Sequence, residues 1–395
     1  MIKREHYIKQ VRGFYDSDLI KVITGIRRCG KSVILEQIKN ELESDNKKCL
    51  YLNLEDRTVS AKINSEENLI NFVLNTKKNG VRYVFLDEVQ IIPNWNLACK
   101  TLRLQGLSVF ITGSNSKLLS SEFTKELSGR YVSFSVRPFV YKELLAYANE
   151  LKTEISMSDY LLYGGFPKIV EFADKNDKIK YLEELNQTII FNDIISRYNI
   201  AKIDLFKRLV DFVLSSNARI FSANSIYNYI KNQKINCSIN TIMKYLGYLK
   251  EAYIIRTLPQ YSTKAKRKLE FFEKIYNEDV GFNTIKQNLG EYDITHNLEN
   301  IVYNELIYMG YELFVYNANG KEIDFLAVKN SKKYLIQVAY SVVEEKAKKR
   351  EFEPFNALDN EFAKILITND EIDFSTSTVR HIKFRDFLTL DKLDF

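Results

Sequence analysis

The order of apolar and polar positions predicts that strands alternate with helices in the first third of the chain. Short apolar runs predict buried strands at Val22–Ile23, Cys49–Leu54, Val81–Glu88 and Leu107–Asn115. Apolar residues at helical spacing predict helices between them, at Val33–Leu42, Glu66–Thr76 and Asn96–Gln105. Such an alternation forms a parallel sheet, which binds ligands at the carboxyl ends of its strands. The pattern therefore predicts an α/β domain with its site at that edge.

The pattern becomes helical after the proline of Arg137-Pro138-Phe139. Three short helices are predicted further on, at Leu205–Leu214, Phe221–Ile230 and Ser238–Ala252. Two extended segments follow them, joined by the basic turn Lys264–Lys268. Three helices and a basic hairpin together predict a winged helix-turn-helix.

The last part of the chain, from about residue 285, has a different order of elements. A helix at His296–Met309 precedes three strands, and a charged helix at Val343–Leu358 precedes a fourth. The three strands are predicted at Tyr311–Tyr316, Lys321–Val328 and Tyr334–Ala339. This part is therefore predicted to have the order α-β-β-β-α-β.

The amino-acid composition is typical of a globular protein. A chain of 395 residues with 45% hydrophobic and 27% charged residues should form two or three globular domains. The net charge of +6 permits contact with nucleic acid without requiring it. The four cysteines show no C-x-x-C pairing, and no apolar run is long enough for a signal core or a membrane span. These features predict a soluble cytoplasmic protein without a disulfide framework or a membrane partner.

The strongest chemical signal is the segment Lys21–Ser32, K-V-I-T-G-I-R-R-C-G-K-S, which fits the phosphate-binding pattern G-x-x-x-x-G-K-[ST]. An apolar strand precedes it and an amphipathic helix follows it, as the motif requires. The loop N–H groups would face phosphate oxygens, Lys31 would reach the β- and γ-phosphates, and Ser32 would ligate Mg²⁺. The nucleotide-binding residues predicted here are Gly25, Ile26, Arg27, Arg28, Cys29, Gly30, Lys31, Ser32 and Val33. Arg27 and Arg28 could contact phosphate or the base, or be solvated.

A second signal lies at the end of the strand V-R-Y-V-F-L-D-E, where two carboxylates follow each other. Asp87 could hold Mg²⁺ through water, and Glu88 could polarise the water that attacks the γ-phosphate. The alternative is an ordinary solvated strand end. One strand, Cys49–Leu54, intervenes along the chain, and this order resembles the P-loop ATPases that use a catalytic glutamate.

Arg130, in L-S-G-R-Y, follows a glycine and could extend toward the nucleotide of a neighbouring subunit as an arginine finger. Such a role would require a homo-oligomer. The alternative is an arginine that satisfies a loop or pairs with a carboxylate.

Five segments together, namely I-K-V-I-T-G-I-R-R-C-G-K-S, F-L-D-E-V-Q, I-T-G-S-N-S, L-S-G-R and R-P-F, resemble a large family of predicted prokaryotic AAA+ ATPases. Its members carry a C-terminal domain of uncharacterised function. The resemblance implies an AAA+-like fold, ATP as ligand, and a polar γ-phosphate sensor at Ser114 or Asn115. The expected fold class is α/β, with a P-loop AAA+-like parallel sheet at 1–136, a helical lid at 137–202, a winged helix-turn-helix at 203–284 and a restriction-endonuclease-like domain at 285–395.

In the winged helix, the Ser238 helix would be the recognition helix, with Asn240, Thr241 and Lys244 as candidate DNA contacts. The wing would place four basic side chains on the phosphate backbone, namely Lys264, Lys266, Arg267 and Lys268. The alternative is a winged helix that serves protein contacts.

The C-terminal order resembles the restriction-endonuclease-like fold, in which carboxylates and an E-x-K motif gather around Mg²⁺. By that resemblance Glu299 and Asp324 occupy the first two metal-ligand positions. The third motif reads Gln337-Val338-Ala339, so that an amide and an alanine replace the glutamate and the lysine. Hydrolysis of a phosphodiester needs charged ligands and a group that activates water, so no nuclease activity is expected.

The function predicted from the sequence is ATP hydrolysis, with ATP and Mg²⁺ as cofactors, that drives a switch or an oligomer coupled to DNA binding. Two alternatives stay open. One is a nucleotide-gated protein-interaction switch with negligible turnover, and the other is an ATPase-coupled nuclease.

Overall fold

The fold was analysed in a computed structural model that describes residues 1–113, 127, 129–232, 235, 237–261, 273–286, 294–318, 320–356, 358 and 362–394. The chain forms two compact units. The first comprises Met1–Pro138 with Glu251–Tyr253, and the second comprises Phe139–Lys250 with Ile254–Phe395. The boundary after Pro138 lies close to the end of the domain predicted at residues 1–136. The two boundaries predicted beyond it, after residues 202 and 284, stay predictions.

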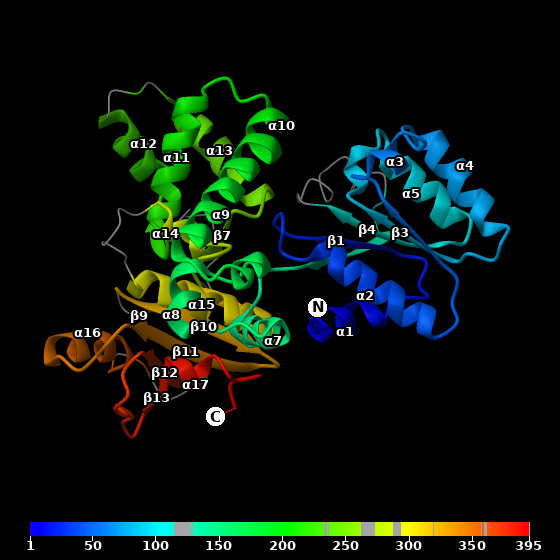
Figure 1. The fold of residues 1–395 in the computed structure, drawn as a ribbon. Coiled ribbons are helices and arrows are strands. Elements are labelled where there is room, and N and C mark those ends of the chain that lie inside the picture. The colour runs from blue at the N-terminus through cyan, green and yellow to red at the C-terminus, as the bar shows by residue number, and fades with distance from the viewer. Residues whose placement is uncertain are drawn as a thin grey trace. The chain divides into compact units, whose positions relative to one another are not determined.

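The first unit is built on a five-stranded parallel sheet with the strand order β2-β3-β4-β1-β5 (Figure 1). The strands are β1 (Ile20–Thr24), β2 (Cys49–Asn53), β3 (Tyr83–Asp87), β4 (Ser108–Gly113) and β5 (Tyr131–Ser135). The helices are α1 (Glu5–Arg12), α2 (Lys31–Ser44), α3 (Arg57–Ser60), α4 (Glu66–Lys77) and α5 (Trp95–Leu104). A short 3-10 turn, η1 (Val89–Ile91), follows β3. From β1 to β4 the strands and helices alternate as the apolar pattern predicted, whereas α1 and β5 are elements that it did not predict.

Burial of both faces explains why the central strands are continuous apolar runs. Alternate residues such as Val22, Val84 and Ile111 point to one face and pack in a core with side chains from α4 and α5. Figure 1 shows α1 and α2 on the opposite face. β4 lies between β1 and β3 in the sheet, although β2 is the strand that separates them along the chain. The residue at the end of β4 is therefore placed between the phosphate loop and the carboxylates of β3.

The second unit begins with helices and contains a small antiparallel sheet. The first helices are α7 (Tyr141–Leu151), α8 (Met157–Tyr163), the 3-10 helix η3 (Pro167–Glu171), α9 (Lys175–Thr188), the π-helix η4 (Ile189–Ile195) and α10 (Ser196–Tyr198). They are followed by α11 (Ile203–Ser215), β6 (Arg219–Phe221), α12 (Ala223–Asn232), α13 (Ile239–Glu251), β7 (Ile255–Pro259) and β8 (Glu273–Asn277). The sheet has the order β6-β8-β7 and is antiparallel. The three predicted helices and two hairpin strands are present, and β6 is a further strand that the sequence did not predict.

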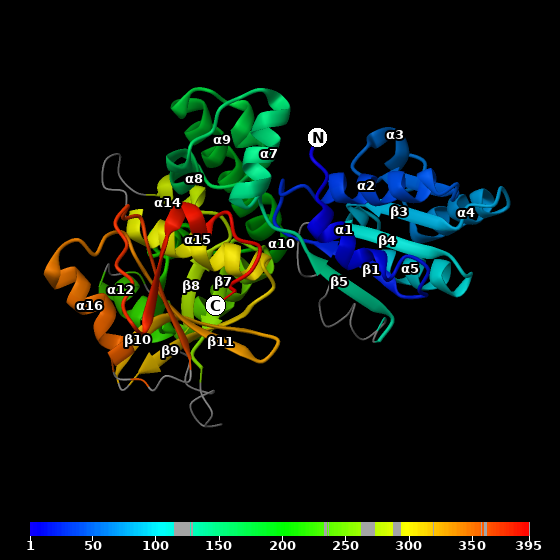
Figure 2. The same cartoon turned by 90° about the horizontal axis from the view of Figure 1, so that it is seen from below.

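The same unit ends in a five-stranded mixed sheet of order β13-β12-β11-β10-β9, seen from a second side in Figure 2. Its elements are α15 (Ile294–Tyr308), β9 (Glu312–Ala318), β10 (Lys321–Lys329), β11 (Lys332–Ala339), α16 (Glu345–Asn356), β12 (Ala363–Thr368), β13 (Val379–Lys383) and α17 (Phe384–Phe387). A short helix, α14 (Gly281–Thr284), precedes them. β9, β10 and β11 are antiparallel, whereas β12 and β13 continue parallel to β11. The order α-β-β-β-α-β is therefore confirmed, and β13 extends it.

Within the described residues, no helix combines the length and the apolar character needed to cross a bilayer.

Candidate functional site

The phosphate loop joins β1 to α2 and depends on two glycines with positive φ. Gly25 has φ +146°, and a Cβ at this position would lie 2.1 Å from the backbone oxygen of Val136. Gly30, at the N-cap of α2, has φ +96°. Only glycine adopts such angles without strain and leaves room for the neighbouring strand. The loop conformation therefore follows directly from the two glycines of the motif.

Lys31, the first residue of α2, is buried and lies against the loop that precedes it. Its ammonium donates hydrogen bonds to the carbonyl oxygens of Gly25 at 3.2 Å and Ile26 at 3.0 Å. The charged end is thus held at the loop, next to the helix N-terminus that favours anions. This is the position from which a lysine reaches the phosphates of a bound nucleotide.

The other predicted loop residues divide into buried and accessible ones. Ile26 and Cys29 are fully buried, so they offer a nucleotide their backbone only. Ser32 and Val33 are half-buried, and Arg28 is exposed with φ +67°. Arg27 Nη1 forms an ion pair with Glu55 at 3.7 Å.

Asp87 and Glu88 end β3 at the same edge of the sheet as the phosphate loop, and Thr112 of β4 connects them. The Thr112 hydroxyl donates a hydrogen bond to Asp87 Oδ1 and accepts one from the Glu88 backbone N–H at 2.8 Å. Tyr51 of β2 donates a hydrogen bond from its hydroxyl to Asp87 Oδ2 at 2.8 Å. Burial, and then the charge of Asp87, raise the pKa of Tyr51 and keep it protonated as a donor. Both carboxylate oxygens of Asp87 are thereby fixed in direction.

Glu88 itself has an unusual backbone, with φ +53° and ψ +51° at the start of the turn η1. Few non-glycine residues adopt this left-handed conformation, and they concentrate at functional sites. The Glu88 side chain accepts a hydrogen bond from Gln90 Nε2. The strained turn and this contact determine where the carboxylate lies.

Arg4 is a site residue that the sequence analysis missed. It precedes α1 and is only 2% exposed, and its guanidinium donates hydrogen bonds to the carbonyl oxygens of Cys29 at 2.8 Å and Arg137 at 3.0 Å. It also lies over the Tyr7 ring, 4.5 Å from the centroid. Arg4 therefore ties the phosphate loop to the end of β5, and no sequence motif indicated this.

Arg130 precedes β5 at the amino edge of the sheet. Its carbonyl oxygen accepts a hydrogen bond from the N–H of Ile20, the first residue of β1, at 3.0 Å, and its side chain is exposed. The phosphate loop follows the other end of β1, which is about 13 Å away for a strand of this length. The structure thus separates Arg130 from the loop of its own chain. The predicted sensors Ser114 and Asn115 lie outside the described residues.

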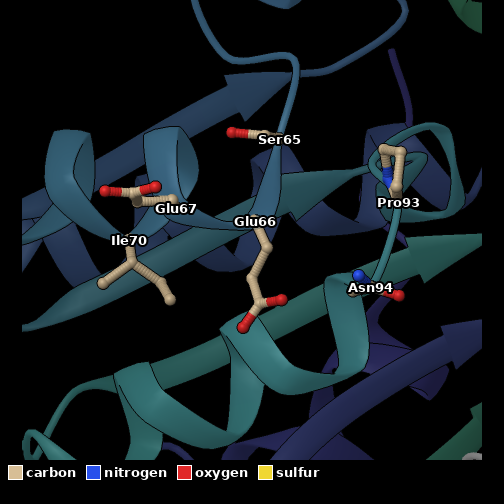
Figure 3. A pocket seen from close by; sticks show the side chains of 6 residues that line it. All are labelled: Ser65, Glu66, Glu67, Ile70, Pro93 and Asn94. Carbon is tan, nitrogen blue, oxygen red and sulfur yellow. The ribbon is translucent and has the colours of Figure 1, made fainter.

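Figure 3 shows a pocket of about 460 Å³ in this unit, lined by Ser65, Glu66, Glu67, Ile70, Pro93 and Asn94. It lies between the start of α4 and the turn before α5. It contains none of the predicted nucleotide residues, and its two glutamates do not favour an anionic ligand.

Among the predicted DNA contacts, Asn240 and Lys244 are exposed on α13 and Thr241 is half-buried. The Thr241 N–H donates a hydrogen bond to Ser238 Oγ at 3.2 Å, which caps the helix. Thr241 therefore takes part in the N-terminal cap of its own helix. The predicted wing residues Lys264, Lys266, Arg267 and Lys268 lie outside the described residues.

The predicted carboxylates of the C-terminal sheet do lie together, with an unexpected lysine between them. Lys274 Nζ of β8 lies 2.7 Å from Glu299 Oε1, 2.7 Å from Glu322 Oε1 and 2.9 Å from Asp324 Oδ1. Gln337 Oε1 accepts a hydrogen bond from the Asp324 N–H at 3.3 Å. The lysine of the E-x-K motif is absent, as predicted, and β8 supplies a different lysine from outside the domain predicted at residues 285–395.

Comparison with protein families and known proteins agrees with the geometry of the first unit. Residues 17–145 match the model of the AAA domain, and residues 155–292 and 295–387 match two domains of unknown function, DUF8612 and DUF4143. An uncharacterized protein of Haemophilus influenzae is 32% identical over 379 residues, which cover 93% of each chain. An uncharacterized protein of Methanocaldococcus jannaschii is 32% identical over 89% of this chain and 82% of its own.

Two solved structures are similar at lower identity. The Walker-type ATPase PaBY2304 of Pyrococcus abyssi is 16% identical, covers 72% of this chain and 96% of its own, and has a TM-score of 0.48. The replication initiator DnaA bound to AMPPCP and single-stranded DNA is 16% identical, covers 62% and 86%, and has a TM-score of 0.34. Both TM-scores lie below 0.5, so neither likeness determines the function of this chain. The phosphate loop, the strand order and the two relatives matched over most of their length identify the family. The chain belongs to the prokaryotic AAA+-type P-loop ATPases that carry a C-terminal domain of unknown function.

Proposed function

We propose that this protein binds and hydrolyses ATP, and that the ATP cycle drives a switch or an oligomer coupled to DNA binding. One observation supports ATP hydrolysis above all: Lys31, Asp87 and Glu88 lie at the same edge of the sheet. Thr112 of β4 lies between the phosphate loop and the strand that carries the two carboxylates. Hydrolysis of ATP needs a phosphate cradle, a metal ligand and a group that orients water, and these residues supply all three.

Each residue has a distinct part in this proposal. The loop N–H groups and Lys31 hold the β- and γ-phosphates, and Glu88 orients the attacking water and takes its proton. Ser32 and Asp87 would hold Mg²⁺, because a hydroxyl and a carboxylate are the hard oxygen donors that this ion prefers. Bound Mg²⁺ would neutralise charge on the phosphates during transfer.

Arg130 is proposed to act on the nucleotide of a neighbouring copy. Its place at the amino edge of the sheet supports a role away from the phosphate loop of its own chain. A homo-oligomer would bring it to the γ-phosphate of the next chain, where a guanidinium stabilises the transition state.

DNA is proposed as the partner of the second unit. The order α11-β6-α12-α13-β7-β8, with the sheet order β6-β8-β7, supports a winged helix-turn-helix in which α13 is the recognition helix. Asn240 and Lys244 are exposed on it and are able to contact base edges or phosphates. Binding to duplex DNA should weaken steeply with salt, and no binding at low salt would remove this part of the proposal.

A protein-interaction switch with negligible turnover is the second candidate, and α13 supplies an observation in its favour. Ile239 and Met243 are 38% and 39% exposed, and their spacing puts them on one face of the helix. Exposed apolar side chains beside Asn240 suit a protein partner better than a phosphate backbone.

The deciding experiment is steady-state ATP hydrolysis by the natural protein and by Glu88→Gln, each with and without duplex DNA. We expect the substitution to lower turnover by at least 100-fold while ATP binding is kept. Glu183→Gln, on the exposed side of α9, serves as the matched control and should not change turnover. Hydrolysis that rises with DNA supports the first candidate. Tight ATP binding without hydrolysis in either protein supports the second.

A further inference from the structure

The most unusual group of charges in the second unit lies far along the chain from the ATP site. Three carboxylates, from Glu299, Glu322 and Asp324, surround the ammonium of Lys274 at 2.7 to 2.9 Å. The side chains of Lys274, Glu299 and Asp324 are only 4%, 7% and 9% exposed, whereas Glu322 is 38% exposed. We refer to these three carboxylates as the carboxylate cage. It is buried, and it opens to solvent on the side of Glu322.

Other groups hold the cage oxygens in place independently of Lys274. The Tyr276 hydroxyl donates a hydrogen bond to Glu299 Oε1 at 2.7 Å. The Val338 N–H donates one to Asp324 Oδ2 at 2.9 Å. The two most buried carboxylates therefore keep their direction toward the centre even if the lysine is replaced.

The charges of the cage show that a cation is needed at its centre. Glu299 and Asp324 are buried, and their carboxylate oxygens lie 2.7 Å and 2.9 Å from the ammonium of Lys274, which is itself 4% exposed. Buried carboxylates without a cation would be strongly destabilising, so the ammonium is required where it is.

We propose that the ammonium of Lys274 occupies the position at which the three carboxylates would otherwise hold a metal ion. The carboxylate cage of the natural protein therefore needs no metal ion. On this proposal, metal-dependent cleavage of nucleic acid by this cluster would require the lysine to leave the cage.

Removal of the lysine should convert the cage into a site for a hard divalent cation. Ca²⁺ is the best probe, because its oxygen ligands lie at about 2.3–2.6 Å and it tolerates irregular geometry. The cage oxygens lie 2.7 to 2.9 Å from the present cation, so they need to move in by only a few tenths of an ångström. Mg²⁺ demands shorter distances, about 2.0–2.1 Å, and should fit less well.

The test compares the full-length natural protein with Lys274→Ala in the absence of nucleotide, with Ca²⁺ as the added ligand. We expect Ca²⁺ to raise the melting temperature of Lys274→Ala by about 3 °C or more and that of the natural protein by much less. Lys274→Met fills the same space without a charge and is expected to show no Ca²⁺ response. Adding Asp324→Asn to Lys274→Ala should weaken the response, because it removes one ligand.

A second variant keeps the proposal testable if Lys274→Ala does not fold. Lys274→Ala combined with Glu299→Gln leaves two carboxylates and less buried charge, and it should fold and keep a weaker Ca²⁺ response. A Ca²⁺ response in the natural protein equal to that of Lys274→Ala would overturn the proposal. So would the absence of any response in both folded alanine variants.

Discussion

The hydroxyl of Thr112 accepts a hydrogen bond from the backbone N–H of Glu88 at 2.8 Å. This contact links β4 to the residue proposed to orient the attacking water. Thr112 is fully buried and also donates to Asp87, so its single hydroxyl uses both of its hydrogen-bonding functions. It lies between the phosphate loop and the carboxylates because β4 lies between β1 and β3. A movement of β4 would therefore move the metal ligand and the water-orienting residue together.

Replacing Thr112 by valine should separate hydrolysis from ATP binding. Valine keeps the shape but leaves the buried Glu88 N–H without its acceptor, which costs about 1–3 kcal/mol. We expect turnover to fall by about tenfold or more, while the affinity for ATP changes little. Thr112→Ser keeps the hydroxyl and should retain most activity. Equal turnover in the valine and serine variants would contradict the role given to the hydroxyl.

Gly25→Ala should destabilise the first unit strongly. The added Cβ would lie 2.1 Å from the Val136 oxygen, and φ is +146°, so both the backbone angle and the neighbouring strand resist it. We expect the free energy of unfolding to fall by about 3 kcal/mol or more. Gly13→Ala is the matched control, since nothing lies within 4 Å of its Cβ and its φ is −64°. Urea titrations of both variants provide the comparison, and similar losses in both would contradict the steric argument.

Arg4→Met should weaken nucleotide binding although Arg4 is no part of the phosphate-binding motif. The substitution removes the hydrogen bonds that Arg4 donates to the carbonyl oxygens of Cys29 and Arg137, and it removes a positive charge beside the loop. We expect the affinity for ATP to fall about tenfold or more, because each lost charged hydrogen bond costs about 1.5–3 kcal/mol. Titration calorimetry with ATP measures this. Lys3→Met replaces the exposed neighbouring residue and serves as the control. It should leave the affinity for ATP unchanged.

Glu305 should make the stability of the second unit depend on pH. Burial raises the pKa of this carboxyl to about 7, and the nearby Glu143 adds to the shift. Hydrogen bonds donated by Tyr141 N–H and Tyr160 hydroxyl, and the charge of Lys142, oppose it. The folded pKa is above that of the unfolded chain, so the stabilising contribution is complete below pH about 4.5 and is lost as pH rises through about 7.

Glu305→Gln should remove this dependence. The amide cannot ionise, and its oxygen can still accept from Tyr141 and Tyr160. Between pH 5 and 8, we expect the natural protein to lose up to about 3 kcal/mol relative to the variant. Urea unfolding of the full-length protein at several pH values measures the difference. Parallel curves for the two proteins would show that Glu305 does not titrate in this range.

The phosphate loop and strands β1 to β4 of the first unit were predictable because their signals are local. The motif Gly25–Ser32 specifies its own backbone, and an apolar run reveals a strand without knowledge of its neighbours. The sheet order is not local, since the sequence shows β2 between β1 and β3 and the fold places β4 there. The contacts of Thr112 were missed for this reason, and the sensor predicted at Ser114 or Asn115 stays a prediction.

Arg4 and Lys274 were missed because their partners are distant in the sequence. Arg4 meets the carbonyl of Arg137 across 133 residues, and Lys274 meets Asp324 across 50. A buried charge has no periodicity or motif of its own, so only the folded chain reveals which groups surround it. Gln337 and Ala339 correctly indicated that the E-x-K motif is lost, but they could not indicate that a lysine enters the cluster from β8.

The position of Lys274 limits how the two C-terminal regions of this protein can recombine in evolution. The lysine belongs to the region matched by DUF8612, whereas Glu299, Glu322 and Asp324 belong to the region matched by DUF4143. The two regions are adjacent modules in sequence, but each supplies charges that the other must neutralise. A C-terminal module moved alone to another ATPase would carry three carboxylates without their cation. Recombination between relatives is therefore expected to exchange the two regions together.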